Sequence, residues 1–338
     1  MTSPNTAPLA GVRLIAVERF GAGPYATGHF ADLGADVIRI EHVNGGLDAA
    51  RATGPTFLGE HDSVYYQSFN GNKRSLSLDL KSDAGREVLE RLIATADGLI
   101  DNLRGDQPDK LKLTYDHVKA SNPKIVCAHI SAYGREDERR GWPGYDYLMQ
   151  AEAGFLSMTG EPDSPPSRFG LSMVDFMTGM TAAFALLAGI MAARSSGAGR
   201  DVDVSLYDVA MHQLTYPAAW YLNDGLVTGR FARSSHPYAV PSQLCKTADG
   251  WIFLMCQTQK FWRILCERME RPDLAADPRF IDEETRYHNR ESITEVLDEA
   301  LSSQTTEAWI ELLAGDVPCG PVYDIAQALD NPYFVRRG

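Results

Sequence analysis

The 338-residue chain is 44% hydrophobic and 23% charged, which is typical of a folded globular protein and excludes an extended disordered chain. Its formal net charge of −13 argues against nucleic-acid and anionic-membrane partners, because both favour a basic surface. An anionic small molecule is not excluded, since a few well-placed cations suffice to bind phosphate. The five cysteines form no CxxC pair, and the N-terminus lacks the basic and apolar regions of a secretory signal, so we expect a cytoplasmic protein.

The first 130 residues alternate between strand and helix patterns. A short apolar run at 12–17 is followed by a glycine-rich turn and a helical segment at 25–33. An amphipathic helix opens at Ser82, and a shorter helix is expected at 115–120. The remaining expected strands are 35–40, 98–100 and 125–130. Strands that alternate with helices at this spacing predict an α/β fold with a parallel, Rossmann-like sheet covered on both faces.

The most apolar stretch, 173–193, predicts a long helix. Asp175 and Thr178 interrupt it, whereas a membrane span needs about 20 largely uninterrupted apolar residues, so we interpret it as a core helix. A strand at 202–204 and a helix at 205–222 follow. These elements complete a predicted large domain over residues 1–224.

The pattern changes after residue 224. A loop rich in glycine, arginine, serine and proline leads into a hairpin of strands 243–247 and 251–256, joined by an Asp-Gly turn. Three helical patterns complete the segment, at 261–269, 291–301 and 307–313. We predict a small α+β domain over residues 225–325.

A glycine motif after the first strand suggests dinucleotide binding. Gly21, Gly23 and Ala26 fit G-x-G-x-x-A, and Glu41 stands at the distance expected of the acid that binds a ribose. However, Pro24 removes a backbone N–H where phosphate would need donors, and no hydride-transfer acid or base follows. The glycines are also consistent with a tight turn of no catalytic role. An NAD-dependent oxidoreductase therefore remains one alternative.

Several segments read together resemble the class III CoA-transferase family, of the CaiB/BaiF type, which includes formyl-CoA transferases and is related to α-methylacyl-CoA racemase. The match covers nearly the whole chain in order, which makes it more specific than one glycine motif. The segments that carry it are Val17–Pro24, Ala31–Glu41, Asn72–Asp79, Gly144–Asp146, Met173–Met180, Gly199–Ser205 and Pro318–Val322. The resemblance implies a transferase that uses acyl-CoA and a small carboxylic acid as substrates, with no tightly bound cofactor.

Asp175 falls where the family keeps its catalytic aspartate. At the start of a helix, the dipole and free N–H groups favour its charged form by about 0.3–1 kcal/mol, although an aspartate in the first turn of a helix is common and usually has no chemical role. The resemblance implies that this carboxylate attacks the thioester and forms an anhydride and then an aspartyl-CoA thioester.

The resemblance also implies which residues surround CoA: Gly21, Ala22, His42, Leu78, Lys81, Asn102, Leu103, Lys110 and Tyr145. Two of them depart from the family, since His42 and Lys110 stand at positions that are often arginine. Compared with arginine, a lysine still offers a positive charge to phosphate but cannot form two parallel hydrogen bonds to it. A glutamine that some members carry is Gly21 here, so no role of that glutamine can be transferred.

Related racemases use a histidine in a Gly-His-Asp block. This chain has Tyr145 in that place, and a phenol with a pKa of about 10 is poorly suited to proton exchange at neutral pH, which disfavours a racemase. The histidines show no metal-binding spacing, so we expect no metal site.

The resemblance further implies an interlocked homodimer and a chain that returns to the large domain after Val322. We expect residues 326–338 to be that returning linker, and one interpretation of the sequence is that the chain is truncated. The alternatives that remain are a CoA-linked racemase, an NAD oxidoreductase and an inactive CoA-binding scaffold. The donor and acceptor acids cannot be read from the sequence.

Overall fold

The computed structural model describes residues 7–43 and 47–337, and these form two compact units. The first comprises Met1–Leu156 and Arg168–Leu226, and the second comprises Ser157–Ser167 and Val227–Gly338. The segment 157–167 therefore groups with the second unit, although the sequence placed it inside a domain ending at residue 224. Residues 326–338 also group with the second unit, and their assignment as a returning linker stays a prediction.

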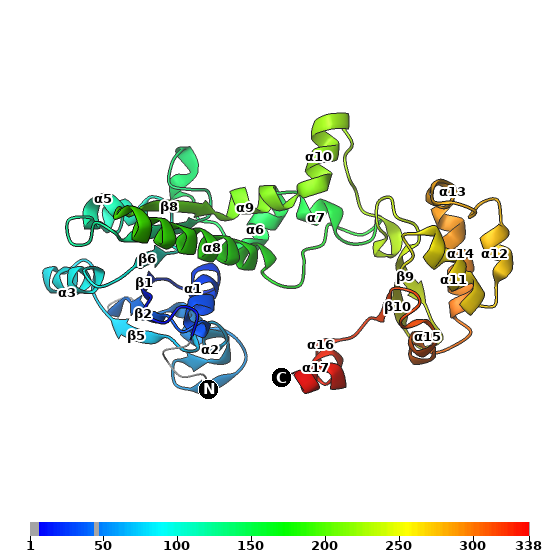
Figure 1. Ribbon diagram of the computed structural model, residues 1–338, viewed down its shortest axis with the longest axis horizontal. Coiled ribbons are helices and arrows are strands. Elements are labelled where there is room, and N and C mark those ends of the chain that lie inside the picture. The colour runs from blue at the N-terminus through cyan, green and yellow to red at the C-terminus, as the bar shows by residue number, and fades with distance from the viewer. Residues whose placement is uncertain (1–6, 44–46, 338) are drawn as a thin grey trace. The chain divides into compact units, whose positions relative to one another are not determined.

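The first unit is built on a six-stranded, all-parallel sheet (Figure 1). Its order is β5-β2-β1-β6-β7-β8, which is 3-2-1-4-5-6 when these strands are counted along the chain, as in doubly wound dinucleotide-binding folds. The strands are β1 (Arg13–Val17), β2 (Asp36–Glu41), β5 (Arg74–Ser77), β6 (Gly98–Asp101), β7 (Val126–Ser131) and β8 (Arg200–Ser205). The α/β prediction is confirmed. The edge strand β5 was missed because its polar sequence, Arg-Ser-Leu-Ser, lacks an apolar run.

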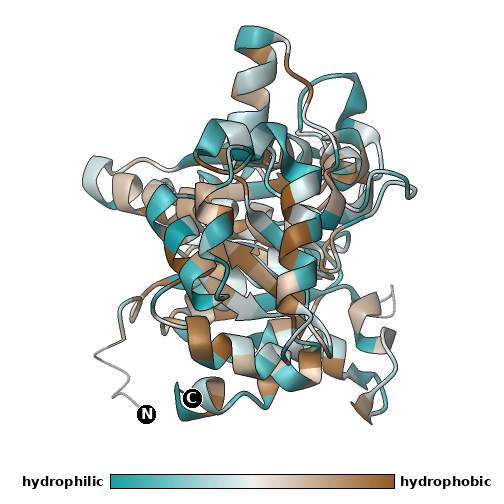
Figure 2. Cartoon of the chain, turned by 90° about the vertical axis from the view of Figure 1, so that its right-hand side faces the viewer, coloured by the Kyte–Doolittle hydropathy of each residue, from teal (hydrophilic) through white to brown (hydrophobic). Residues whose placement is uncertain are grey.

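Helices cover both faces of this sheet because successive strand residues point to opposite sides. In β1, Leu14 and Ala16 pack towards α1 and α8, whereas Ile15 and Val17 pack towards α3. In Figure 2, apolar stretches, in brown, appear on strands in the middle of the view. The helices of the unit are α1 (Ala22–Asp32), α2 (Val64–Asn70), α3 (Asp83–Ile93), α4 (Gln107–Lys110), α5 (Tyr115–Val118), α6 (Asp146–Glu152), α8 (Met173–Ser196), α9 (Leu206–Gln213) and α10 (Thr215–Asp224). Helix α7 (Phe155–Met158) begins in this unit and ends in the segment that groups with the second. A two-stranded ribbon, β3 (Phe57–Gly59) with β4 (Asp62–Ser63), completes it.

Helix α8 is long and apolar enough to cross a membrane by length and composition alone. Leu186 and Ile190 nevertheless lie in the core of the unit, packed beside the sheet. Its opposite side is open, since Met180, Phe184 and Met191 are all more than half exposed. The core prediction therefore holds for one side of the helix.

The predicted helix at 205–222 is two helices. Helix α9 ends at Gln213 and α10 begins at Thr215, whose φ of 40° lies in the left-handed region and breaks the helical path.

The second unit has its own core around an antiparallel sheet of order β11-β10-β9. Trp262 and Trp309 are fully buried there, against Ile252 and Leu254 of the central strand. The third strand was not predicted, because Cys-Gly-Pro carries no strand pattern. The strands are β9 (Ser242–Lys246), β10 (Trp251–Met255) and β11 (Cys319–Pro321). The helices are α11 (Gln259–Arg268), α12 (Pro272–Ala276), α13 (Glu283–His288), α14 (Arg290–Leu301), α15 (Thr306–Leu313), α16 (Ile325–Leu329) and α17 (Pro332–Arg337).

Candidate active site

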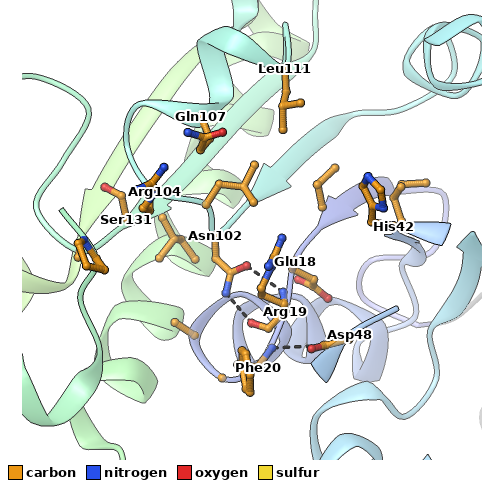
Figure 3. Close-up of a pocket in the computed structure, with 18 of the residues that line it drawn as sticks. Glu18, Arg19, Phe20, His42, Asp48, Asn102, Arg104, Gln107, Leu111 and Ser131 are labelled. Atoms are coloured by element: carbon orange, nitrogen blue, oxygen red, sulfur yellow. Dashed lines mark hydrogen bonds between the residues drawn. The ribbon is translucent and has the colours of Figure 1, made fainter. Parts of the chain in front are cut away.

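A cavity of about 530 Å³ lies where the strands of the first unit end (Figure 3). Its walls come from the segments that directly follow β1, β2, β6 and β7. The chain reverses its strand order between β1 and β6, and ligands of open parallel sheets bind outside the carboxyl ends of strands at such a switch point.

The cavity brings together nearly all of the residues that the sequence assigned to a site. Those that line it are Gly21, Ala22, His42, Leu78, Lys81, Asn102, Leu103, Tyr145 and Asp175. Lys110 is the exception. It is not among the lining residues, and its Nζ lies 2.5 Å from Asp106 Oδ2 on the exposed side of α4.

Asp175 stands in the first turn of α8 and faces the turn after β1. A Cβ added to Gly21 would lie 2.7 Å from Asp175 Oδ2, so a larger residue there would require the carboxylate to move. The backbone N–H of Asp175 donates to Asp146 Oδ2 at 2.9 Å, and Gln150 Nε2 donates to the other oxygen of Asp146 at 2.6 Å. These hydrogen bonds connect the start of α8 to α6.

The surroundings of Asp175 disfavour its charged form. Burial, with a further contribution from the nearby Asp146 carboxylate, raises the pKa of Asp175 to about 7. Both effects oppose the contribution of the helix dipole, which favours the charged form. Within residues 7–43 and 47–337, no cation forms an ion pair with Asp175 that would offset burial and the Asp146 charge.

Glu41, another carboxylate at the same cavity, is fully paired. Glu41 accepts hydrogen bonds from Arg51, Ser75, Tyr66 and the backbone N–H of Asp48. Although burial opposes it, this set of donors lowers the pKa of Glu41 to about 2. Glu41 is 3% exposed, so it cannot serve as the ribose acid that the glycine motif suggested.

Cationic side chains also line the cavity. Besides His42 and Lys81, they include Arg19 and Arg104, which the sequence analysis did not assign to the site. Arg19 follows β1 and Arg104 follows β6, so their position after adjoining parallel strands was a signal that could have found them. Side chains of this kind can hold the phosphates of an anionic ligand.

Asn102 connects two of these segments. Its Oδ1 accepts the N–H of Arg19 at 2.9 Å, and its Nδ2 donates to the carbonyl of Arg19 at 2.6 Å (Figure 3). Asn102 follows Asp101, which is held by the buried His129 at 2.6 Å, and His129 also contacts Asp201 at 3.0 Å. Burial alone would lower the pKa of His129, but these two carboxylates outweigh it and raise the pKa to about 9.

The geometry therefore places the partly buried Asp175 carboxylate, which forms no ion pair with any residue that the structure describes, in a cavity whose lining also includes cationic side chains. Such a carboxylate can act as a nucleophile or as a general acid or base. In the described ranges, no three histidine, cysteine, aspartate or glutamate side chains gather as metal ligands would.

Comparison with known proteins identifies the family. The model of CoA-transferase family III matches residues 9–338. A succinate–glutarate CoA-transferase of Agrobacterium fabrum is 33% identical over 98% of this chain and 84% of its own length. A human succinyl-CoA:glutarate CoA-transferase is 30% identical over 99% of this chain and 76% of its own length.

Solved structures agree with this result. A CAIB/BAIF family protein from Brucella suis superposes with a TM-score of 0.86 and 31% identity, covering 98% of this chain and 88% of that one. The protein is therefore a transferase, and it belongs to CoA-transferase family III.

Proposed function

We propose that this enzyme moves coenzyme A from an acyl-CoA thioester to a free carboxylic acid, with Asp175 as the covalent nucleophile. The observation that carries the proposal is the unpaired Asp175 carboxylate, which lines the same cavity as the CoA-binding positions. A carboxylate whose charge is poorly stabilised is more basic than usual, and its deprotonated form is correspondingly the better nucleophile.

The proposed reaction runs in four acyl transfers. Asp175 attacks the thioester carbonyl, which releases CoA thiolate and leaves a mixed anhydride. The thiolate attacks the aspartyl carbonyl, which releases the donor acid and forms an aspartyl-CoA thioester. The acceptor carboxylate attacks this thioester and again releases the thiolate. The thiolate then attacks the acceptor carbonyl, so that the new acyl-CoA leaves and the Asp175 carboxylate is restored.

CoA itself would lie along the cavity, with its phosphates towards the cationic groups. His42 and Lys81 are the sequence-assigned candidates, and Arg19 and Arg104 join them from the structure. Asn102 and Leu103 would contact CoA through the segment after β6. Tyr145, which is 68% exposed at the rim, would contact the acyl or pantetheine part.

The substrate acids are proposed from relatives alone. The names of the relatives pair succinyl-CoA with mesaconate in Haloarcula hispanica and with glutarate in humans. We therefore propose short dicarboxylic acids as the first donors and acceptors to test.

We also propose that the enzyme is an interlocked homodimer in the cytoplasm. The exposed apolar side of α8, formed by Met180, Phe184 and Met191, is a surface that a second copy would cover. All five cysteines are free, as a reducing compartment favours.

The test is a mass-spectrometric screen of the purified protein with succinyl-, acetyl- and other acyl-CoAs against a panel of free acids. We expect a new acyl-CoA from wild type and none from Asp175→Ala, together with an acyl or CoA adduct on Asp175. Full turnover by Asp175→Ala would reject the nucleophile. Exchange of an α-proton with deuterated solvent, without CoA transfer, would instead indicate the racemase alternative.

A further inference from the structure

The turn between β1 and α1 holds an unfavourable backbone conformation next to the proposed nucleophile. Phe20 has a φ of 57°, in the left-handed region that side chains other than glycine rarely adopt. The next residue is Gly21, against which the Asp175 carboxylate lies. The approach of this turn to Asp175 thus depends on a residue that would relax to another conformation if nothing held it.

A buried ion pair holds it. The N–H of Phe20 donates to Asp48 Oδ2 at 3.3 Å (Figure 3), and the same oxygen pairs with the Arg39 guanidinium. Arg39 Nη2 also donates to the carbonyl of Glu18 at 3.0 Å. Arg39 is fully buried and Asp48 is 5% exposed. One buried pair therefore anchors the turn at both its first and its third residue.

The remaining groups of the cluster keep this pair in place. The Arg39 guanidinium lies 4.9 Å from the ring centre of Tyr66, and Asp48 Oδ1 accepts the N–H of Ala50 at 2.9 Å. The Asp48 N–H donates to the paired Glu41 at 3.1 Å. Asp48 cannot rotate away without breaking several contacts, which is what a fixed anchor requires.

We propose that Asp48, supported by Arg39, is a positioning residue for Asp175. It holds Phe20 in the left-handed conformation, so that Gly21 and the first N–H groups of α1 keep their place beside the reacting carboxylate. This inference rests on the proposed function, because it takes Asp175 as the nucleophile. Asp48 acts through the turn and does not itself touch the reacting atoms.

The experiment is a double-mutant cycle of Asp48→Asn with Phe20→Gly. Glycine adopts the left-handed conformation without strain, so it removes the need for the anchor. We expect Asp48→Asn alone to lower kcat about 10- to 100-fold, the effect of a displacement of about 1 Å, while KM for acyl-CoA changes less. In the Phe20→Gly background the same substitution should cost less than about threefold.

A second pair of variants keeps the test decisive if Asp48→Asn does not fold. Phe20→Gly and Phe20→Val both remove the ring that lines the cavity, but only valine is strained at positive φ. We expect kcat of Phe20→Val to be at least about tenfold below that of Phe20→Gly. Equal values, or an Asp48→Asn penalty that is absent or identical in both backgrounds, would overturn the inference.

Asp97→Asn is the matched control. Asp97 also accepts a backbone N–H, from Arg13 at 3.0 Å, and pairs with an arginine, Arg194 at 2.9 Å, but at the other ends of the strands. The kcat of Asp97→Asn should equal that of the wild-type enzyme. The rate of amide hydrogen exchange of residues 19–22 should rise in Asp48→Asn, and this measurement needs no substrate. It therefore tests the anchor even if the wild-type protein transfers no CoA. The absence of CoA transfer would reject only the proposed function.

Discussion

Two carboxylates that line one cavity have opposite electrostatic surroundings. Glu41, at the end of β2, is surrounded by donors, and its pKa falls to about 2. Asp175, at the start of α8, lies near another carboxylate, and its pKa rises to about 7. Both are partly or wholly buried, so burial does not distinguish them. Their partners do.

This contrast separates a structural acid from a reactive one. A buried carboxylate that is fully paired keeps its charge and fixes the elements around it, whereas one without a cation remains available for chemistry. Pairs of acids whose environments move their pKa values apart mark the division of roles in many active sites. Here the paired cluster of Glu41, Asp48 and Arg39 holds the turn that faces the unpaired Asp175.

Neutralising the paired acid should produce the largest loss of stability. In Glu41→Gln the side chain keeps its shape, but Arg39 and Arg51 lose a buried counter-charge. We expect a decrease of about 3–5 kcal/mol in the free energy of unfolding, measured by denaturant titration at pH 7. The control is Glu90→Gln, an exposed pair with Arg86 at 3.1 Å, which should change stability by less than about 0.5 kcal/mol. An equally small change in the free energy of unfolding of Glu41→Gln would mean that Glu41 is not a structural acid, and the contrast with Asp175 would be lost.

Neutralising Asp175, the unpaired acid, should change the free energy of unfolding in the opposite direction. A pKa raised above its unfolded value of about 3.8 means that the native state binds the proton more tightly, so stability falls as pH rises from about 4 to 7. Asp175→Asn avoids this cost and should stabilise the protein by up to about 4 kcal/mol at pH 8 and by little at pH 4. Thermal melts of both proteins across that range would measure it. A variant that is less stable than wild type at pH 8 would show that Asp175 is a structural acid after all.

The sequence predicted the sheet more completely than the site's electrostatics. Apolar runs revealed four of the six strands of the parallel sheet within one or two residues of their ends, and the Val202–Val204 core of β8, because buried parallel strands are continuously hydrophobic. β5 and β11 were not seen, since their residues pair as edge strands without an apolar pattern.

Most of the residues that the family resemblance assigned to a site line one cavity, with Lys110 as the exception, but the pairing of charges could not be predicted. Nothing in the sequence shows that Glu41 meets Arg51, ten residues away, or that Asp175 meets Asp146. These partners come from separate elements that only the folded chain brings together. The direction of the Asp175 pKa therefore cannot be judged from its position on the helix alone.

The pH dependence of turnover should report the same carboxylate. If Asp175 must be deprotonated to attack, kcat/KM for acyl-CoA should rise about tenfold per pH unit below pH 7 and level off above it. The measurement is an initial-rate series from pH 5 to 9 with a stability check at each point. Because kcat/KM reports groups of the free enzyme, a flat profile down to pH 5 would mean that burial does not raise the pKa of Asp175 in solution.

The smallest expected effect concerns two lysines that the sequence could not tell apart. Lys81 lines the cavity, whereas Lys110 lies outside its lining and pairs with Asp106, so only Lys81 is free to meet a phosphate. Lys81→Ala should weaken CoA binding about five- to tenfold, and Lys110→Ala less than about twofold, since an exposed ion pair contributes little. Titration calorimetry with CoA and with 3′-dephospho-CoA would measure both. A loss in Lys110→Ala that equals the Lys81→Ala loss and vanishes with 3′-dephospho-CoA would mean that Lys110 leaves Asp106 for the 3′-phosphate, and the family-based assignment of Lys110 would then be correct.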